Sequence, residues 1–366
     1  MSSLKYWIWL SALDGIGAVT AGRLLRRFDS PEQIFFARRE EYDGIPEIRR
    51  EEIELLCGKN LTAANRALAV CAENGYRGVT IRDAEYPERL RNIYGPPVVL
   101  YVRGTFPALD EEAAVAIVGT RSCTPYGITQ AERTGYELAR RGLLVVSGLA
   151  RGIDSAAAKG ALRAGGRVLG VLGCGLDVIY PAENGALYDD VASVGALLSE
   201  YPPGTPAVGA HFPIRNRILS GVSLGVAIIE APKKSGALIT ASRALEQGRD
   251  VFALPGNVDS VMSAGANGLL RDGAIPLLTP DDIVSEYADL FPAKIASGRT
   301  RELVPIDEKI AGKLIRDQTD GAEPRRVRRK KEIDNEAPRE YIDFSKWIET
   351  LPENEKKVAS ALYALA

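Results

Sequence analysis

The sequence predicts an α/β fold whose main domain is a doubly wound, mostly parallel sheet. Between residues 113 and 254, six short apolar runs alternate with longer stretches of helical spacing. The runs are apolar throughout rather than at every second residue, which is typical of strands buried on both faces. Several of them end in glycine-rich, polar turns, as expected at the edge of such a sheet where ligands bind.

We expect residues 1–80 to form a small helical domain. Apolar residues at helical spacing surround two glycine turns, Gly15-Ile16-Gly17 and Gly44-Ile45-Pro46. Such units resemble the helix-hairpin-helix of SAM-like domains, in which turn amides meet a nucleic-acid phosphate. The same glycines would also let two helices pack closely, and the sequence leaves both interpretations open.

The main domain is expected over residues 81–288, opening with a strand-bearing connector at 81–104. Its candidate strands are 113–118, 143–147, 167–172, 196–199, 224–230 and 250–254, with helices that include 126–141, 153–163 and 236–247. Residues 289–340 are polar and charged, which is typical of a linker, and their basic block 325–331 is interpreted as a solvated tether. Residues 341–366 predict one further helix.

Composition limits the function. With 46 basic and 48 acidic residues, any affinity for nucleic acid must come from a local patch. The four cysteines are scattered without a C-x-x-C pair, and the chain has one histidine, so we expect no metal site. No apolar segment reaches about 18 residues, and no cleavage signal follows the N-terminus. We therefore expect a cytoplasmic protein that uses neither membrane nor cofactor.

The most informative segment is Ala210–Ser220, AHFPIRNRILS. It places Phe212, Arg215, Asn216 and Arg217 directly before an apolar run. We expect a helix to begin after Pro213, so that guanidinium groups, an amide and free N–H groups converge on one anion. Phosphate is the anion that this arrangement fits.

The turns that follow other strands supply further candidates. Glycine lets a backbone approach a phosphate, and arginine or lysine supplies positive charge. Each turn alone is also explained by tight strand-to-helix geometry, but arginines gathered on one rim favour a polyanion site. The candidates are Gly119, Thr120, Arg121, Ser147, Gly148, Arg151, Gly175, Lys233, Lys234 and Ser235.

Aromatic and acidic residues complete the predicted site. Tyr180, Tyr201 and Phe212 follow strand ends, where exposed rings can stack on unpaired bases; this favours single strands over duplexes. Four carboxylates near strand ends are interpreted as partners of the arginines, namely Asp154, Asp177, Glu200 and Glu230.

We expect no catalytic residues. A histidine-based triad could be built only around His211. The G-x-S-x-G match at Gly221 to Gly225 lies at the start of an apolar run and not in a turn between a strand and a helix, so it does not supply the serine. Neither G-x-G-x-x-G nor G-x-x-x-x-G-K-[ST] occurs, so the standard nucleotide-binding signatures are missing. The alternative is a nucleotide phosphoribohydrolase-like enzyme, but its P-G-G-x-G-T motif is reduced here to Pro255-Gly256-Asn257, with Glu230 as a candidate acid.

Eight segments in order resemble the bacterial DNA-processing protein A family, also called Smf. They are AIVGTR, SGLARGID, GCGLDVIYPAEN, SEYPPG, HFPIRNRILSGVS, SGALITA, GRDVFALPG and GANGLLRDGA. The resemblance implies a Rossmann-like domain that binds single-stranded DNA, forms homodimers and loads the RecA recombinase during natural transformation, without established catalysis. It also assigns DNA binding to Arg121 and to the pocket around Gly119, Ser147, Gly148, Arg151 and Gly175.

Two departures from the family pattern stand out. Relatives often carry a basic residue after the tyrosine-proline pair, where this chain has Ala182. Some members end in a winged-helix-like domain, of which residues 341–366 resemble a truncated beginning.

We expect a dimer to form through the apolar regions 238–245 or 261–270.

Overall fold

The structure, a computed structural model, describes residues 3–295, which belong to one compact unit. The predicted helix 341–366, the basic block 325–331 and the predicted linker beyond residue 295 lie outside the described residues. The predicted boundaries between domains therefore stay predictions.

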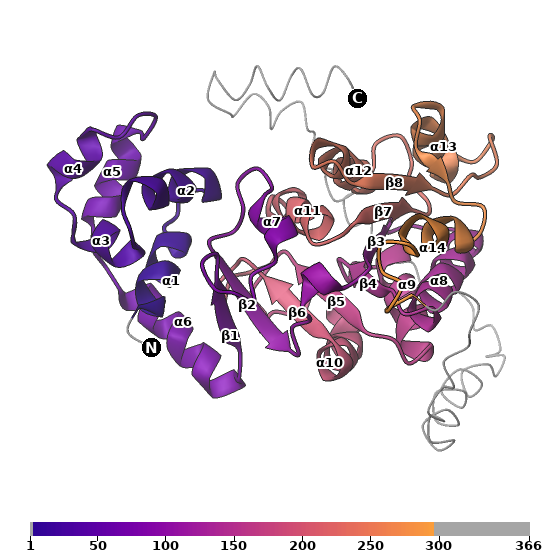
Figure 1. Ribbon diagram of the computed structural model, residues 1–366, viewed down its shortest axis with the longest axis horizontal. Coiled ribbons are helices and arrows are strands. Elements are labelled where there is room, and N and C mark those ends of the chain that lie inside the picture. Colours follow the sequence, from indigo (N-terminus) through magenta and orange to yellow (C-terminus); the bar gives the residue numbers. More distant parts are fainter. Residues whose placement is uncertain (1–2, 296–366) are drawn as a thin grey trace, which may run out of the picture. The chain divides into compact units, whose positions relative to one another are not determined.

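Six helices open the chain, where the sequence predicted helical structure without giving their number (Figure 1, indigo to violet). They are α1 (Leu4–Ala12), α2 (Ala18–Arg27), α3 (Pro31–Phe36), α4 (Arg39–Asp43), α5 (Arg50–Cys57) and α6 (Thr62–Asn74). Local signals fix their ends: Ser30 Oγ accepts a hydrogen bond from Gln33 N ahead of α3, and Gly75, with a φ of 66°, ends α6. Their core is partly aromatic, since the rings of Trp9 and Phe35 meet edge to face at 5.0 Å.

Both predicted glycine turns join two helices, α1 to α2 and α4 to α5. Their middle residues, Ile16 and Ile45, are buried. A Cβ on Gly15 would lie 2.9 Å from Leu55 Cδ1, so this glycine brings its turn close to α5. That contact supports the packing interpretation of the first turn.

Nine strands form one sheet in the order β1-β2-β6-β5-β4-β3-β7-β8-β9. All neighbours from β6 to β9 are parallel, whereas β2 is antiparallel to both β1 and β6. The strands are β1 (Arg77–Thr80), β2 (Val99–Gly104), β3 (Ala114–Val118), β4 (Leu144–Ser147), β5 (Val168–Leu172), β6 (Ala196–Ser199), β7 (Gly225–Ile228), β8 (Asp250–Ala253) and β9 (Ile275–Pro276).

The strand order reverses between β3 and β7. From β3 the chain moves outward through β4, β5 and β6, and then returns to place β7 on the other side of β3, with Val115 opposite Gly225 and Val118 opposite Ile228. In open parallel sheets this reversal opens a crevice at the carboxyl ends of the strands. The fold thus directs attention to the turns after β3, β4, β5 and β7.

Helices cover both faces of the sheet, and β3 contributes to both cores. Val115 and Ile117 belong to the core that includes residues of α8, α9 and α10, whereas Ala116 and Val118 belong to the core that includes residues of α11, α12 and α13. Figure 1 shows these helices on the two faces of the sheet. The helices of this part are α7 (Glu88–Arg91), α8 (Pro125–Arg140), α9 (Ile153–Arg163), α10 (Gly185–Val194), α11 (His211–Gly221), α12 (Gly236–Glu246), α13 (Ala264–Arg271) and α14 (Asp281–Tyr287), with single 3-10 turns at Leu109–Glu111, Ala182–Asn184 and Val261–Ser263. This layering confirms the predicted doubly wound fold.

The predicted elements agree closely with the observed ones. All six apolar runs contain a strand, and α9 occupies Ile153–Arg163 as predicted. The connector carries β2, while β1 ends at Thr80, just before the boundary drawn at residue 81. The expected start of α11 after Pro213 was wrong, because the helix begins at His211. Proline is tolerated in a first turn, since N–H groups there lack helical acceptors.

Candidate nucleic-acid interface

The turn after β3 places Arg121 on the surface of the carboxyl edge. Thr120 is buried, and its N–H donates to the Glu230 carbonyl at 2.7 Å, which ties this turn to the end of β7. Gly119 leaves no room for a side chain, because a Cβ there would lie 2.5 Å from Ile153 Cγ1. The tight turn thus holds Arg121 exposed at the reversal point of the sheet.

The turn after β4 is internally bonded. Ser147 is fully buried, and its hydroxyl donates to the Asp154 carbonyl at 3.0 Å. Gly148 N donates to Asp154 Oδ2 at 3.1 Å. Gly152 has a φ of 83°, and a Cβ there would lie 2.6 Å from the Thr120 carbonyl, so the two turns lie in close contact. Ser147 and Gly148 therefore shape the edge from beneath.

Arg215 lies in the interior. Only 4% of the residue is exposed, and its Nη1 donates to the carbonyls of Gly148, at 3.1 Å, and Val171. Burial lowers the pKa of Arg215 against the opposing charge of Asp154. Burial also raises the pKa of Asp154 to about 6, although Arg215 and the Gly119 and Gly148 amides oppose it. Arg215 joins β4 to β5 beneath the predicted contact surface.

Asn216 and Arg217 also make internal contacts. Asn216 accepts from Arg215 Nε at 3.2 Å, and its amide faces the Gly236 carbonyl at 3.4 Å, at the start of α12. Arg217 Nη2 lies 2.5 Å from Glu200 Oε2, with side chains 14% and 13% exposed. Burial raises the pKa of Glu200 against the attraction of Arg217. These residues hold α11 against its neighbours.

Phe212, at the start of α11, has an aromatic ring and a cation as neighbours. The Arg121 guanidinium carbon lies 5.1 Å from the centre of the Phe212 ring, and the Tyr180 ring lies 5.2 Å away on an interplanar angle of 32°. Tyr180 is 38% exposed. Nearby, Tyr201 stacks on His211 at 4.2 Å. The edge thus presents a cation and rings side by side, which suits a phosphate and its unstacked base.

The remaining candidates border this surface. Arg151 is exposed and donates through Nε to Glu183 Oε1 at 2.6 Å. Gly175 is buried, and its N–H donates to the Thr205 carbonyl at 3.0 Å. Ser235 caps α12 by accepting from Ala237 N at 3.3 Å, and Lys233 and Lys234 before it are exposed. Three cationic side chains therefore add to Arg121.

The expected pairing of carboxylates with arginines was correct for Glu200 and wrong for two others. Asp177 accepts from Gly204 N at 2.8 Å. Glu230 accepts from the amide and the hydroxyl of Thr124, at 2.9 and 2.6 Å, and so caps the N-terminus of α8. Thr124 escaped the sequence reasoning, although a threonine before Pro125 is a recognisable helix-start signal.

A cavity lies at the carboxyl edge, where the start of α8 meets the turns after β7 and β8. Its volume is about 430 Å³, and it is lined by Thr124, Tyr126, Glu230, Pro255, Gly256, Asn257, Ser260 and Ser263. Within the described residues, no cluster of three or more histidine, cysteine or acidic side chains could hold a metal ion. No described helix combines the length and apolarity that crossing a membrane requires.

The sheet order and its basic, aromatic edge define a Rossmann-like α/β protein with a surface suited to polyanions. Residues 77–288 match the family model described as DNA recombination-mediator protein A, and the chain belongs to this family of DNA-processing proteins. It is 42% identical over 224 residues to DNA processing protein DprA of Bacillus subtilis, covering 61% of this chain and 75% of that protein. Protein Smf of Synechocystis is 35% identical over 313 residues, covering 84% and 78%.

Solved structures of relatives share the fold. The X-ray structure of DprA from Streptococcus pneumoniae matches with a TM-score of 0.64 and 34% identity, covering 77% of this chain and 96% of that one. A Helicobacter pylori DprA structure, described as giving insight into that protein's single-stranded DNA binding mode, matches with a TM-score of 0.54 and 32% identity, covering 58% and 96%. The family resemblance seen in the sequence is confirmed.

Proposed function

We propose that this protein binds single-stranded DNA without catalysis, protects incoming DNA and loads RecA on it during natural transformation in the cytoplasm. The observation that carries the proposal is the contact of Arg121 with Phe212 beside Tyr180 at the carboxyl edge. A phosphate can pair with the guanidinium while the neighbouring base stacks on a ring. The Helicobacter pylori relative, whose description concerns single-stranded DNA binding, supports the same ligand.

We assign the predicted DNA-binding residues to two roles according to their exposure. Arg121, Arg151, Lys233 and Lys234 are exposed and would contact DNA, together with the Phe212 ring beside Arg121. The other candidates would position that surface instead: Thr120, Ser147, Gly148, Gly175, Arg215 and Asn216 are buried, and Gly119 is half-buried. Arg217, whose guanidinium bonds to Glu200, and Ser235, as a helix cap, join the second group.

The decisive experiment is fluorescence anisotropy of a labelled single strand and of an equal-length duplex, with wild type, Arg121→Ala and Arg133→Ala. Arg133 is an exposed arginine in the middle of α8 and serves as the matched control. We expect preference for the single strand, weakened about tenfold or more by Arg121→Ala and unchanged by Arg133→Ala. Equal affinity of wild type and Arg121→Ala would reject the site.

RecA loading is the finer part of the proposal, and it rests on the family. The test measures RecA filament formation on single strands already coated with a single-strand binding protein. Wild type should accelerate it, and Arg121→Ala should do so less. No acceleration by a wild type that binds DNA would restrict the function to binding.

We also propose a homodimer. Leu245 and Val261, from the two apolar regions predicted for the interface, are 61% and 71% exposed and so offer apolar surface. Light scattering at micromolar concentration should give a molar mass twice that of one chain. Leu245→Glu or Val261→Glu should lower this measured mass towards that of the monomer. A wild-type monomer would contradict the dimer.

One observation favours the enzymatic alternative: Glu230 and the segment Pro255-Gly256-Asn257 line the same cavity. Both carboxylate oxygens of Glu230 are, however, bonded to Thr124, and the residue is only 2% exposed, which suits a helix cap better than an acid catalyst. Incubation with nucleoside monophosphates tests the point. Release of free base that is lost in Glu230→Gln would establish the enzyme.

A further inference from the structure

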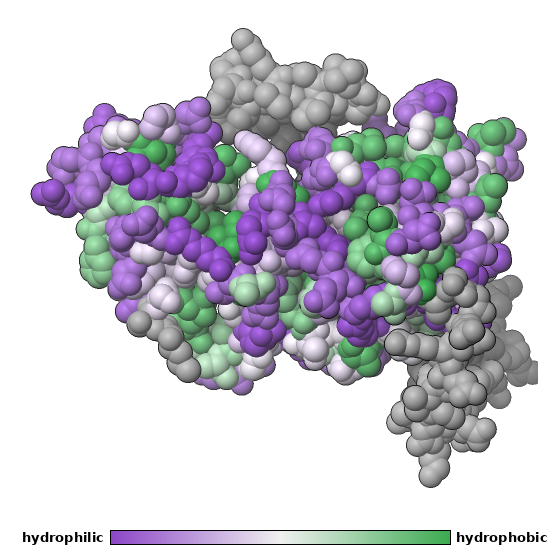
Figure 2. All heavy atoms as spheres, in the orientation of Figure 1, coloured by the Kyte–Doolittle hydropathy of each residue, from purple (hydrophilic) through white to green (hydrophobic). Residues whose placement is uncertain are grey.

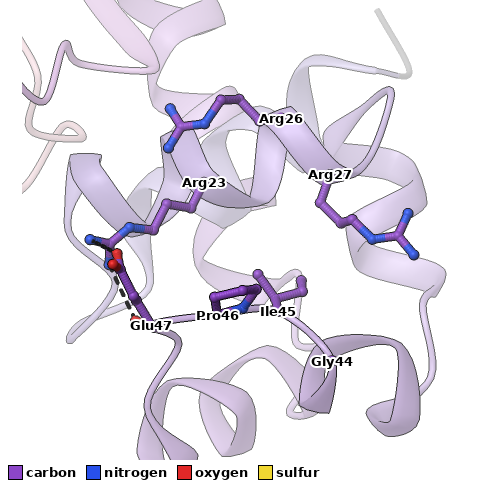
Figure 3. Close-up of a pocket in the computed structure, with 7 residues that line it drawn as sticks. All are labelled: Arg23, Arg26, Arg27, Gly44, Ile45, Pro46 and Glu47. Carbon is purple, nitrogen blue, oxygen red and sulfur yellow. Dashed lines mark hydrogen bonds and ion pairs between the residues drawn. The ribbon is translucent and has the colours of Figure 1, made fainter.

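The helical N-terminal part has a basic pocket that the proposed DNA site does not use. It has a volume of about 400 Å³ and lies between α2 and the turn that joins α4 to α5. Its lining is Arg23, Arg26, Arg27, Gly44, Ile45, Pro46 and Glu47 (Figure 3). The pocket therefore combines three guanidinium groups with one carboxylate.

The single carboxylate is already engaged. Arg23 Nη2 lies 2.5 Å from Glu47 Oε2, and Arg23 Nη1 donates to the Glu47 carbonyl at 3.2 Å. Figure 3 shows Arg23 reaching Glu47, whereas the guanidinium groups of Arg26 and Arg27 end without a partner among the residues drawn. Both are exposed. Two positive charges at the pocket thus stay available to an anion.

Arg23, Arg26 and Arg27 lie at positions i, i+3 and i+4 of α2, and the repulsion between their charges lowers the stability of the helix. Like charges at these spacings destabilise a helix by a few tenths of a kcal/mol per pair. Arg26 and Arg27 lie in the last turn of α2, where the helix dipole favours positive charge and offsets part of this destabilisation. The dipole does not account for the cavity, however, nor for the turn that closes it opposite the arginines.

The shape and chemistry of the pocket suit a nucleotide unit. Its volume falls in the range of small-molecule sites, roughly 300–1,000 Å³. Ile45 and Pro46 give it an apolar side against which a sugar can pack, while Arg26 and Arg27 can pair with a phosphate. The surrounding surface over α2, α4 and α5 is largely hydrophilic (Figure 2). Nothing in this lining favours a particular base.

We infer that this basic pocket is a second contact for the phosphodiester backbone of the DNA strand bound at the carboxyl edge. The inference rests on the proposed function, because it takes the same ligand. The pocket would engage the strand only when it is long enough to leave the first site. Linking two weak contacts on one strand raises the overall affinity without any new interaction at the first site.

The test compares binding of single strands of about 6 and about 40 nucleotides, one within and one well beyond the roughly 4–16 nucleotides of a common single site. The variant is Arg26→Ala/Arg27→Ala, and the matched control is Arg39→Ala/Arg66→Ala, which removes the same charge from exposed arginines of α4 and α6 outside the pocket. We expect the variant to bind the long strand about tenfold more weakly and the short strand as wild type does. Its log–log salt slope for the long strand should be smaller by about 1.4.

The outcomes separate the two proposals. Equal loss in variant and control would reduce the effect to general charge and overturn the pocket. Unchanged binding of the long strand would overturn it as well, while leaving the Arg121 result intact. If Arg121→Ala had no effect but Arg26→Ala/Arg27→Ala weakened binding, the edge site would fall, and the basic pocket would be a DNA contact of its own instead of a second contact. Circular dichroism of both double variants checks that the helices remain folded.

Discussion

At the scale of single residues, Asp154 carries a carboxyl group that the fold keeps away from water. Its partners are the Gly148 amide and the nearby charge of Arg215, yet burial raises its pKa to about 6. An unfolded chain would have this pKa near 3.9. Because the folded pKa is the higher one, the folded protein retains a proton that the unfolded chain has already lost.

The free energy of unfolding should therefore fall as pH rises from about 4 to about 6. The full effect is on the order of 3 kcal/mol. Asp154→Asn removes the titrating group, so the free energy of unfolding of the variant should rise relative to that of wild type over this pH range. Urea unfolding of both proteins measures the difference. A constant difference in the free energy of unfolding between the two proteins from pH 4 to 7 would contradict this prediction.

The pair of Arg217 and Glu200 allows a test of structure against binding. Arg217→Ala would leave Glu200 buried without its partner, a loss of about 3–5 kcal/mol in the free energy of unfolding. Arg243→Ala is the control, since its partner Glu246 is exposed and such pairs contribute about 0–1 kcal/mol. Chemical unfolding measures both. Comparable small losses would show that Arg217 is not a structural residue.

At the scale of elements, α8 and α9 pack closely against each other. A Cβ on Gly135 would lie 2.1 Å from the Ala157 carbonyl oxygen, and one on Gly160 would lie 2.1 Å from that of Glu132. Each helix thus offers a glycine where the backbone of the other passes. The two helices follow β3 and β4, so their spacing also sets the spacing of the turns that carry Arg121 and Arg151.

Gly135→Ala should lower the free energy of unfolding by about 1–3 kcal/mol, because the helices must separate. Gly268→Ala in α13 is the matched control, since no atom lies within 4 Å of a Cβ there. It should stabilise the protein by up to about 1 kcal/mol through helix propensity. Thermal unfolding distinguishes the two, and equal shifts of the same sign would refute the packing argument.

Elements with a strong local signal could be predicted from the sequence, and contacts between distant segments could not. Buried strands such as β5 are continuous apolar runs, so their positions were evident. The burial of Arg215 was not, because its acceptors Gly148 and Val171 lie 67 and 44 residues away in the chain. An arginine beside an asparagine indicates a polar site. Whether the Arg215 side chain faces DNA or buried carbonyl groups depends on how α11 packs on the sheet, which the local sequence does not specify.

At the scale of the whole molecule, the net charge of −2 provides no general attraction for DNA. The slope of log affinity against log salt concentration should then report how many phosphates this local surface contacts. For a short single strand, the four exposed cations Arg121, Arg151, Lys233 and Lys234 predict a log–log slope of about −3 at most. Arg121→Ala should reduce its magnitude by about 0.7. Anisotropy titrations at four salt concentrations measure the slope, and a value near zero would exclude phosphate contacts.

The two outermost strands of the sheet, β1 and β9, have a further consequence. They contain four and two residues, and β9 ends in Pro276, which lacks an N–H group to donate. Short strands and proline at a sheet edge oppose pairing with the sheet of another molecule. The two edges therefore oppose aggregation, by strand pairing, of copies that are crowded along one DNA strand.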